Sequence, residues 1–202
     1  MSRIIMVLAI MFMATPAVAA GKDKALTLYG GYRDGGRFTD EISGQRLEVE
    51  GSGAVSLAYD FAKDASRAYQ IFLSHQRSDL SLKNVPAATS ESIGMNITYL
   101  HIGGTNFWQS RLGKGWYVVG GLGATFFDPG EGFDSELRAS GNLGFGYEQP
   151  LGKTFGLRFE ARGYATLVNS SGGFFCSGGC IVSISGEVFT QGELMLGLSA
   201  RF

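Results

Sequence analysis

The chain ends with the stretch that decides its fold, Glu193-Leu194-Met195-Leu196-Gly197-Leu198-Ser199-Ala200-Arg201-Phe202. Alternate residues form an apolar row of leucines, alanine and phenylalanine, whereas the other row carries the charges of Glu193 and Arg201. A strict period of two predicts a β-strand. A strand with one lipid-facing row and one polar, lumen-facing row is typical of a transmembrane β-barrel. The aromatic residue at the last position agrees with that interpretation.

The same alternation recurs along the chain. It predicts strands at about 25–33, 49–61, 67–80, 93–104, 115–127, 137–148, 155–167 and 188–202. The segment around His101 is the least regular, because Leu100 and His101 reverse the order of polar and apolar residues. It is therefore the candidate position for a β-bulge or a register change.

The connections between these segments also alternate. Those after the second, fourth and sixth segments are mostly short, and the others are longer and more polar. Outer-membrane barrels have short periplasmic turns and longer external loops in this order. The sequence therefore predicts an all-β, eight-stranded antiparallel up-and-down transmembrane β-barrel.

The N-terminus predicts export. A single arginine, Arg3, precedes an apolar run over 4–13 and a small-x-small cleavage pattern at 17–19. This arrangement is typical of a secretory signal peptide, and the run is too short for a membrane-spanning helix. We therefore expect a cleaved signal peptide over 1–20 and a barrel domain over 21–202.

Composition narrows the functional class. Loss of Arg3 leaves 16 of the 17 basic residues against 18 acidic ones, a net charge of about −2 without a basic excess for nucleic acid. After the signal, no stretch approaches the ~18 consecutive apolar residues of a transmembrane helix. The 31 glycines and four prolines suit a strongly curved sheet, in which glycine relieves crowding.

A soluble periplasmic barrel of the lipocalin type, with the apolar rows turned inward, is the alternative. Alternation by itself does not say which row faces inward. Aromatic residues near strand ends on the apolar row favour the membrane, because outer-membrane barrels carry aromatic girdles at both interfaces. These residues are Tyr32, Tyr59, Phe61, Trp116, Phe126, Tyr147, Phe155 and Phe202. We therefore predict a location in the bacterial outer membrane.

The predicted lumen row carries charges of both signs. Side chains nearly fill a barrel of about eight strands, and lone charges there would be costly, so we expect them to pair. We interpret the row as a structural salt-bridge network that plugs the lumen, with a selective pore as the alternative. The predicted network consists of Arg138, Arg158, Glu160, Arg162, Glu193 and Arg201. The same row also holds Arg33, Asp60 and Glu148.

Two cysteines, Cys176 and Cys180, lie in the predicted loop 169–187 as Cys-Ser-Gly-Gly-Cys. In an exported chain, this spacing predicts a local disulfide, because the compartment is oxidising. The loop supplies too few ligands for a metal site. Redox motifs normally have two intervening residues, not three. Reactive thiols are the alternative.

Catalytic and metal sites have weak support in the sequence. His75 has Ser74 beside it, but adjacent strand residues point to opposite faces, so the two side chains cannot easily meet. His101 lies in the irregular segment. The acidic loop 128–136 lacks the ordered oxygen spacing of a calcium loop, which favours a solvated loop. We predict no catalytic residue, metal or cofactor.

Several stretches resemble one group of proteins. They are Leu-Tyr-Gly-Gly-Tyr-Arg at 28–33, Tyr-Val-Val-Gly-Gly-Leu-Gly-Ala-Thr at 117–125, Arg-Phe-Glu-Ala-Arg-Gly-Tyr at 158–164, Phe-Cys-Ser-Gly-Gly-Cys at 175–180 and the terminal Ala-Arg-Phe. With the signal peptide, they resemble small proteobacterial outer-membrane barrels of the OmpA/OmpX/OmpW-like barrel-domain group, over essentially the whole mature chain. The resemblance implies insertion by the barrel-assembly machinery, with Phe202 as its signal, and implies no reaction.

We therefore expect a monomeric, non-enzymatic outer-membrane barrel with a surface or envelope-structural role. Its expected partners are outer-membrane lipid and lipopolysaccharide, and the barrel-assembly machinery during insertion. No peptidoglycan-binding domain follows Phe202, so that OmpA function is not expected. One alternative is a passive channel for small hydrophobic solutes, as OmpW-like barrels suggest. A lipid-modifying enzyme is the weaker alternative.

Overall fold

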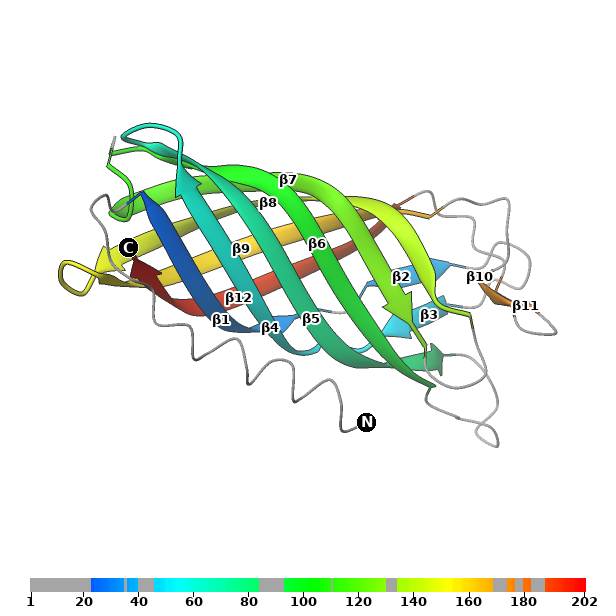
Figure 1. The fold of residues 1–202 in the computed structure, drawn as a ribbon. Coiled ribbons are helices and arrows are strands. Elements are labelled where there is room, and N and C mark those ends of the chain that lie inside the picture. The colour runs from blue at the N-terminus through cyan, green and yellow to red at the C-terminus, as the bar shows by residue number, and fades with distance from the viewer. Residues whose placement is uncertain are drawn as a thin grey trace, which may run out of the picture.

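Eight long strands form the body of the computed structural model (Figure 1). They are β1 Lys24–Arg33, β4 Ser52–Ala62, β5 Arg67–Lys83, β6 Ile93–Phe107, β7 Gly115–Asp128, β8 Glu136–Pro150, β9 Phe155–Leu167 and β12 Val188–Arg201. Four short strands lie in the longer connections: β2 Arg37–Thr39, β3 Arg46–Val49, β10 Phe174–Cys176 and β11 Cys180–Val182. The structure describes residues 23–34, 36–39, 46–83, 93–109, 111–129, 134–168, 174–176, 180–182 and 188–202.

The sheet closes on itself because the first long strand pairs with the last. β1 and β12 are antiparallel, with Tyr29 opposite Gly197 and Arg33 opposite Glu193. Every other long strand pairs with its neighbours in sequence, including β5 with β6. Closure leaves no long strand with an unpaired edge, which lipid could not satisfy. The predicted eight-stranded antiparallel barrel is thus confirmed. Among the described residues, no helix is long and apolar enough to cross a membrane.

The last strand shows which row faces outward. Leu194 is 70% exposed and Leu198 is 51% exposed, while Glu193 and Ser199 are buried in the lumen. The same arrangement holds on β1, where Leu28 faces outward and the neighbouring inward side chains are buried. Leucines on the outside of a closed barrel can bury their apolar surface against acyl chains, whereas in water that surface would stay exposed. The soluble alternative, with its apolar rows inward, is therefore wrong.

The irregular segment around His101 contains neither a bulge nor a register change. β6 keeps one continuous ladder with both β5 and β7. Tyr99 and His101 point into the lumen, as does Ile97 nearer the end of the strand, while Leu100 faces outward. The apparent reversal arises because the environment changes along the barrel: the lumen is polar in its middle and apolar toward one end.

One strand boundary differs from the prediction. Residues 49–61 were expected to form one strand, but Val49 ends β3, which pairs with β5 beyond the end of β4. The break falls at Gly51, where a Cβ would lie 2.4 Å from the hydroxyl of Tyr32. β12 begins at Val188, directly after the predicted loop 169–187, and pairs with β9 from Leu167 onward.

The connections alternate in length as predicted. The turns at 63–66, 108–114 and 151–154 lie at the same end as the C-terminus, and the short strands β2, β3, β10 and β11 lie at the other end (Figure 1). We call these the periplasmic and external ends, following the rule for outer-membrane barrels. The predicted signal peptide, 1–20, lies outside the described residues.

The turn between β4 and β5 is held together by one carboxylate. Asp64 accepts hydrogen bonds from the backbone N–H groups of Ser66 and Arg67, at 3.0 and 2.8 Å, and pairs with the Arg67 guanidinium at 2.6 Å. The bond from the Ser66 N–H, with help from Arg67, lowers the pKa of Asp64 to about 2. Asp64 therefore stays ionised and keeps Arg67 engaged within the turn.

Aromatic side chains surround the periplasmic end of the barrel. Phe61 lies 5.9 Å from Tyr59 and 5.5 Å from Tyr69, measured between ring centroids. On the far side, Trp116 meets Tyr147 edge to face at 5.2 Å. Amphipathic rings concentrate at the level of lipid headgroups, so this belt marks one membrane interface.

A leucine in the middle of the lipid-facing wall should tolerate no charge. We expect Leu196→Arg to destabilise the folded barrel in lipid by about 2–4 kcal/mol, the cost of arginine near the bilayer midplane. Leu151→Arg, in the exposed turn at the periplasmic end, serves as the control and should change stability little. Guanidinium titration of folding in phospholipid vesicles measures both, and equal stability for the two variants would contradict a lipid-facing Leu196.

Candidate functional site

A column of paired charges occupies the lumen, and we call it the lumen column. Its members are Arg33 of β1, Asp60 of β4, Glu148 of β8, Arg158, Glu160 and Arg162 of β9, and Glu193 and Arg201 of β12. Within the described residues, four arginines thus balance four carboxylates. Every cation of the column is a guanidinium, whose planar fork can hold several acceptors at once and stays charged when buried.

The periplasmic layer of the lumen column is centred on Arg158, which is 1% exposed. Its guanidinium donates to Glu148 at 2.8 Å and to Asp60 at 2.7 Å. Glu148 also accepts hydrogen bonds from Ser199 at 3.0 Å and from Arg201 at 3.2 Å. One arginine therefore ties together β4, β8 and β9 across the barrel, which is possible because the lumen is narrow.

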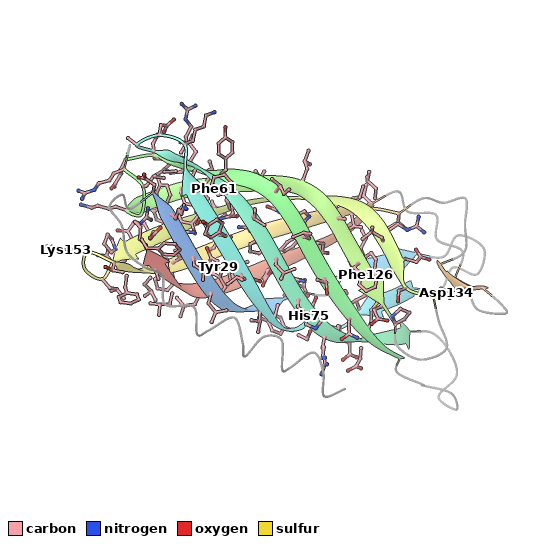
Figure 2. The ribbon with its side chains drawn as sticks, viewed as in Figure 1. Tyr29, Phe61, His75, Phe126, Asp134 and Lys153 are labelled. Atoms are coloured by element: carbon pink, nitrogen blue, oxygen red, sulfur yellow. The ribbon has the colours of Figure 1, made fainter. Side chains whose placement is uncertain are left out.

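The middle layer is centred on Glu160. It pairs with Arg162 at 2.6 Å and accepts hydrogen bonds from the hydroxyls of Tyr117, at 2.7 Å, and Tyr29, at 3.2 Å. Arg162 also donates to Gln70 at 3.0 Å. Figure 2 shows Tyr29 inside the barrel, directed toward its centre. Every charge in this layer therefore has several partners.

Gln70 joins the middle and periplasmic layers. It accepts a hydrogen bond from Arg162 through Oε1 and donates one from Nε2 to Asp60 at 2.9 Å. Because Asp60 also pairs with Arg158, the two layers form one connected network. Connected and satisfied networks resist the loss of any one contact better than separate pairs do.

The external layer of the lumen column contains Arg33 and Glu193, which pair at 2.8 Å across the β1–β12 seam. Glu193 accepts a hydrogen bond from Tyr164 at 2.5 Å, and Arg33 donates to Ser74. The Arg33 guanidinium also lies over the rings of Tyr99 and Tyr164, 4.9 and 4.8 Å from their centroids. The strand pair that closes the barrel is thus locked by a buried ion pair.

Apolar side chains fill the lumen beyond the external layer. Phe127 of β7 and Phe189 of β12 meet edge to face at 5.7 Å, and Met95 and Ile97 of β6 are buried beside them. This group of side chains continues the packing of the lumen from the external layer of the lumen column toward the external end.

Inward-facing glycines make room for the large side chains of the network. A Cβ at Gly197 would lie 2.4 Å from the ring of Tyr29, and one at Gly146 would lie 2.5 Å from the ring of Tyr117. At Gly156, it would lie 2.7 Å from a Glu148 carboxylate oxygen. Glycine thus serves the packing of the lumen column, in addition to the curvature of the sheet.

The structure separates one predicted member from the rest of the network. Arg158, Glu160, Arg162, Glu193 and Arg201 all lie in the lumen column. Arg138, in contrast, lies near the external end of β8 and pairs at 2.6 Å with Glu136 on its own strand. The alternation predicted that Arg138 faces inward. It could not predict how far along the barrel axis Arg138 lies, and that position decides which carboxylate it meets.

Sequence reasoning left several partners out of the predicted network. The tyrosines at 29, 99, 117 and 164 provide hydroxyls or ring faces to its charges, and Gln70 connects its layers. Each of them lies on the inward row of its strand, so the alternation of residues along the strand was the signal that could have identified them. Tyrosine combines an apolar ring with a polar hydroxyl, so its presence in a row does not by itself show whether that row faces lipid or the lumen.

The structure gives backbone positions for the two cysteines of the predicted disulfide and for Phe202, the predicted assembly signal. Cys176 and Cys180 stand opposite each other in the β10–β11 ladder, but their side chains lie outside the described part of the chain, so the disulfide stays a prediction. Phe202 exchanges backbone hydrogen bonds with Lys24 at 2.9 and 3.0 Å. It therefore sits at the periplasmic end of the closing seam, and its role in assembly stays a prediction.

The histidines lie on opposite faces of the wall. His75 faces outward and its Nδ1 lies 2.9 Å from the Thr98 hydroxyl, whereas Ser74 points into the lumen. The Nε2 of His101 lies 2.9 Å from the Ser140 hydroxyl, and both residues are buried. Among the residues that the structure describes, no group of three or more His, Cys, Asp or Glu could hold a metal ion.

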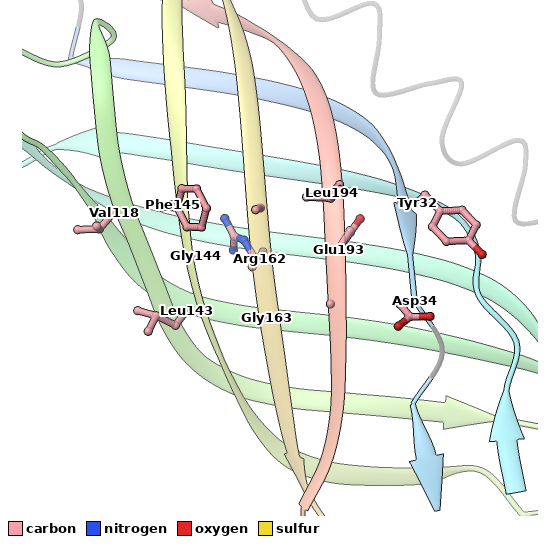
Figure 3. A pocket seen from close by; sticks show the side chains of 12 residues that line it. Tyr32, Asp34, Val118, Leu143, Gly144, Phe145, Arg162, Gly163, Glu193 and Leu194 are labelled. Atoms are coloured by element: carbon pink, nitrogen blue, oxygen red, sulfur yellow. The ribbon is translucent and has the colours of Figure 1, made fainter.

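The outer wall carries an apolar groove of about 610 Å³ (Figure 3). It lies where Gly163 of β9 stands opposite Gly192 of β12, because neither residue has a side chain to cover the wall. Leu194 and Phe145 flank it on the outward face. A Cβ at Gly192 would meet nothing within 4 Å, so the groove is open toward lipid.

Solved outer-membrane barrels share this fold. The solid-state NMR structure of outer membrane protein AlkL in DMPC lipid bilayers matches with a TM-score of 0.61 at 14% identity, over 93% of this chain and 94% of that one. The crystal structure of OprG from Pseudomonas aeruginosa matches with a TM-score of 0.51 at 12% identity, over 91% and 98%. No protein-family model and no curated protein matches the sequence.

Identities this low establish the fold and leave the activity open. The closed sheet, the outward leucines and these structural neighbours agree with one another. The chain is therefore a small eight-stranded β-barrel of the bacterial outer membrane, with the fold of the OmpA/OmpX/OmpW-like group that its sequence resembles.

Proposed function

We propose that this barrel is a closed, non-enzymatic and monomeric component of the outer membrane, with a structural role in the cell envelope. The observation that carries the proposal is the lumen column. It crosses the interior in three layers, and each of its four arginines has a carboxylate partner. A solute on this path would have to separate buried ion pairs.

The charge balance of the lumen column supports closure over selective conduction. A selective pore needs a ring or a path dominated by one sign of charge, whereas the lumen column is neutral and its charges are engaged with each other. Breaking a buried pair costs several kcal/mol, because the remaining charge is left without a partner. The apolar side chains around Phe127 and Phe189 add a second barrier.

The surroundings of the Ser140–His101 pair support a non-enzymatic role. A nucleophile must reach its substrate, but His101 is 1% exposed and Ser140 is 7% exposed on the lumen side of the wall. The second ring nitrogen of His101 has no hydrogen-bond partner within the described residues. A group that orients the base is therefore missing from the described surroundings of this pair.

One observation favours a second candidate, a passive conduit for small hydrophobic solutes. The apolar groove over Gly163 and Gly192 provides a surface on the wall that such a solute could occupy. The groove faces lipid and lies on the opposite face of the wall from the lumen column. We therefore place this function second.

Conductance in planar bilayers tests closure directly. We expect the wild-type barrel to add no discrete current steps. The double variant Glu160→Ala, Arg162→Ala should pass current, because it removes the middle layer of the lumen column without leaving a lone charge there. Heat-modifiable migration on a denaturing gel checks that both proteins are folded. Regular steps from the wild-type barrel would contradict the proposal.

The structural role of the lumen column predicts strong coupling between its partners. We expect Arg162→Met alone to destabilise the barrel by about 3–5 kcal/mol, since it leaves Glu160 charged and unpaired by arginine. The double variant Glu160→Met, Arg162→Met should recover much of that loss. Denaturant titrations in lipid vesicles complete the double-mutant cycle, and additive effects would show that the pair is not coupled.

A further inference from the structure

A basin of about 670 Å³ opens at the periplasmic end, beside the mouth of the barrel. The β6–β7 turn forms one wall with Arg111 and Lys114, and the β8–β9 turn forms the other with Lys153. Glu148 and Arg201 of the lumen column also line it. Figure 2 shows Lys153 at this end of the molecule and Asp134 at the opposite end.

The wall formed by the β6–β7 turn is fixed in place. The backbone N–H of Leu112 donates to the carbonyl of Ala65 at 2.8 Å, and the Leu112 side chain packs against the buried rings of Phe107 and Tyr117. Gly113 has a φ of 77°, a conformation that favours glycine. These contacts hold the backbone of the turn at Leu112 and Gly113, between Arg111 and Lys114.

The absence of a side chain at Gly113 also positions Arg201. A Cβ there would lie 2.2 Å from an Arg201 guanidinium nitrogen, so the guanidinium rests against the backbone of the turn. Arg201 makes one contact to Glu148, at 3.2 Å, and its side chain is 16% exposed. An arginine has five N–H donors, so it retains donors that can be directed into the basin.

The basin is strongly positive. Arg111, Lys114, Lys153 and Arg201 line it, and the carboxylate of Glu148 is already engaged by Arg158 and Arg201. Within the described part of the chain, neither Arg111 nor Lys114 takes part in a salt bridge, and both are exposed. Arg67 contrasts with them, because Asp64 holds it within its own turn.

The basin also touches the membrane. Phe155 lines it and is 53% exposed on the lipid-facing side of β9. The edge-to-face pair of Trp116 and Tyr147 belongs to the aromatic belt at the same end. Because such belts lie at headgroup level, the cations of the basin stand where the headgroups of the inner leaflet would lie. At the external end, in contrast, Asp34, Glu50, Asp79 and Asp134 are exposed.

We propose that this basin binds the phosphate of an anionic phospholipid from the inner leaflet of the outer membrane. Arg111, Lys114 and Arg201 contact the phosphate, and the acyl chains lie along the wall beside Phe155. Juxtamembrane lysine and arginine clusters attract anionic headgroups through the same charge complementarity. The proposal goes beyond closure of the lumen, because it involves the mouth and the adjoining lipid-facing wall.

The two tryptophans of the chain, Trp108 and Trp116, are natural reporters of lipid binding. Both lie at the periplasmic end and are exposed, at 65% and 48%. Bromine atoms on lipid acyl chains quench tryptophan fluorescence on contact. The experiment folds the mature barrel into vesicles that contain either brominated phosphatidylglycerol or brominated phosphatidylcholine, and compares the quenching to obtain a relative binding constant.

We expect the wild-type barrel to prefer phosphatidylglycerol about fivefold or more, because its phosphate charge is uncompensated, whereas the choline of phosphatidylcholine neutralises the phosphate of that lipid. The variant Arg111→Gln, Lys114→Gln should reduce this preference to near one. The matched control Lys24→Gln, Lys63→Gln removes the same charge from the same end outside the basin, and should keep most of the preference. All four positions are exposed, and heat-modifiable migration checks folding.

Three results would overturn the proposal. One is equal quenching of the wild-type barrel by the two lipids. Another is an equal loss of preference in the basin variant and in the control, which would indicate unspecific surface charge. The third is loss of the preference when inorganic phosphate replaces chloride at constant ionic strength, because the basin would then bind a free anion in place of a lipid. None of these results depends on whether the lumen conducts.

Discussion

The structure depends on one constraint: lipid offers no hydrogen-bond partner to a peptide group. Every backbone N–H and C=O of a spanning sheet must therefore bond to another strand, which forces β1 to pair with β12 and the sheet to close. Once the sheet is closed, alternation directs every second side chain into a narrow lumen. The leucines outside and the charges inside are two consequences of the same closure.

Charges that are enclosed in this way have to satisfy each other. The lumen column does so with arginines, whose several donors let Arg158 hold Asp60 and Glu148 together. Tyrosine hydroxyls satisfy Glu160 and Glu193 further, and inward-facing glycines such as Gly197 leave the rings their space. Together, these residues give the interior a core of paired polar side chains. The protein thus has a polar core and an apolar surface, the reverse of a soluble domain.

Much of this architecture could be predicted from the sequence, because a period of two is a local property. The eight long strands, their lipid-facing rows and the inward direction of Arg158, Glu160 and Arg162 all followed from alternation. Pairing could not be predicted, since Arg33 and Glu193 are 160 residues apart and meet only through closure. The position of an inward residue along the barrel axis could not be predicted either. Arg138 pairs with Glu136 near the external end, and the inward residues of β6 are apolar there.

The direction of the two rows is the central claim, and paramagnetic broadening in lipid tests it most directly. A nitroxide attached near the end of a lipid acyl chain broadens NMR signals of nearby groups. We predict strong broadening of the methyl signals of Leu196 and Leu198, and sharp guanidinium signals for Arg33 and Arg158, which the wall shields. Sharp leucine methyls together with broadened guanidinium signals would contradict the account.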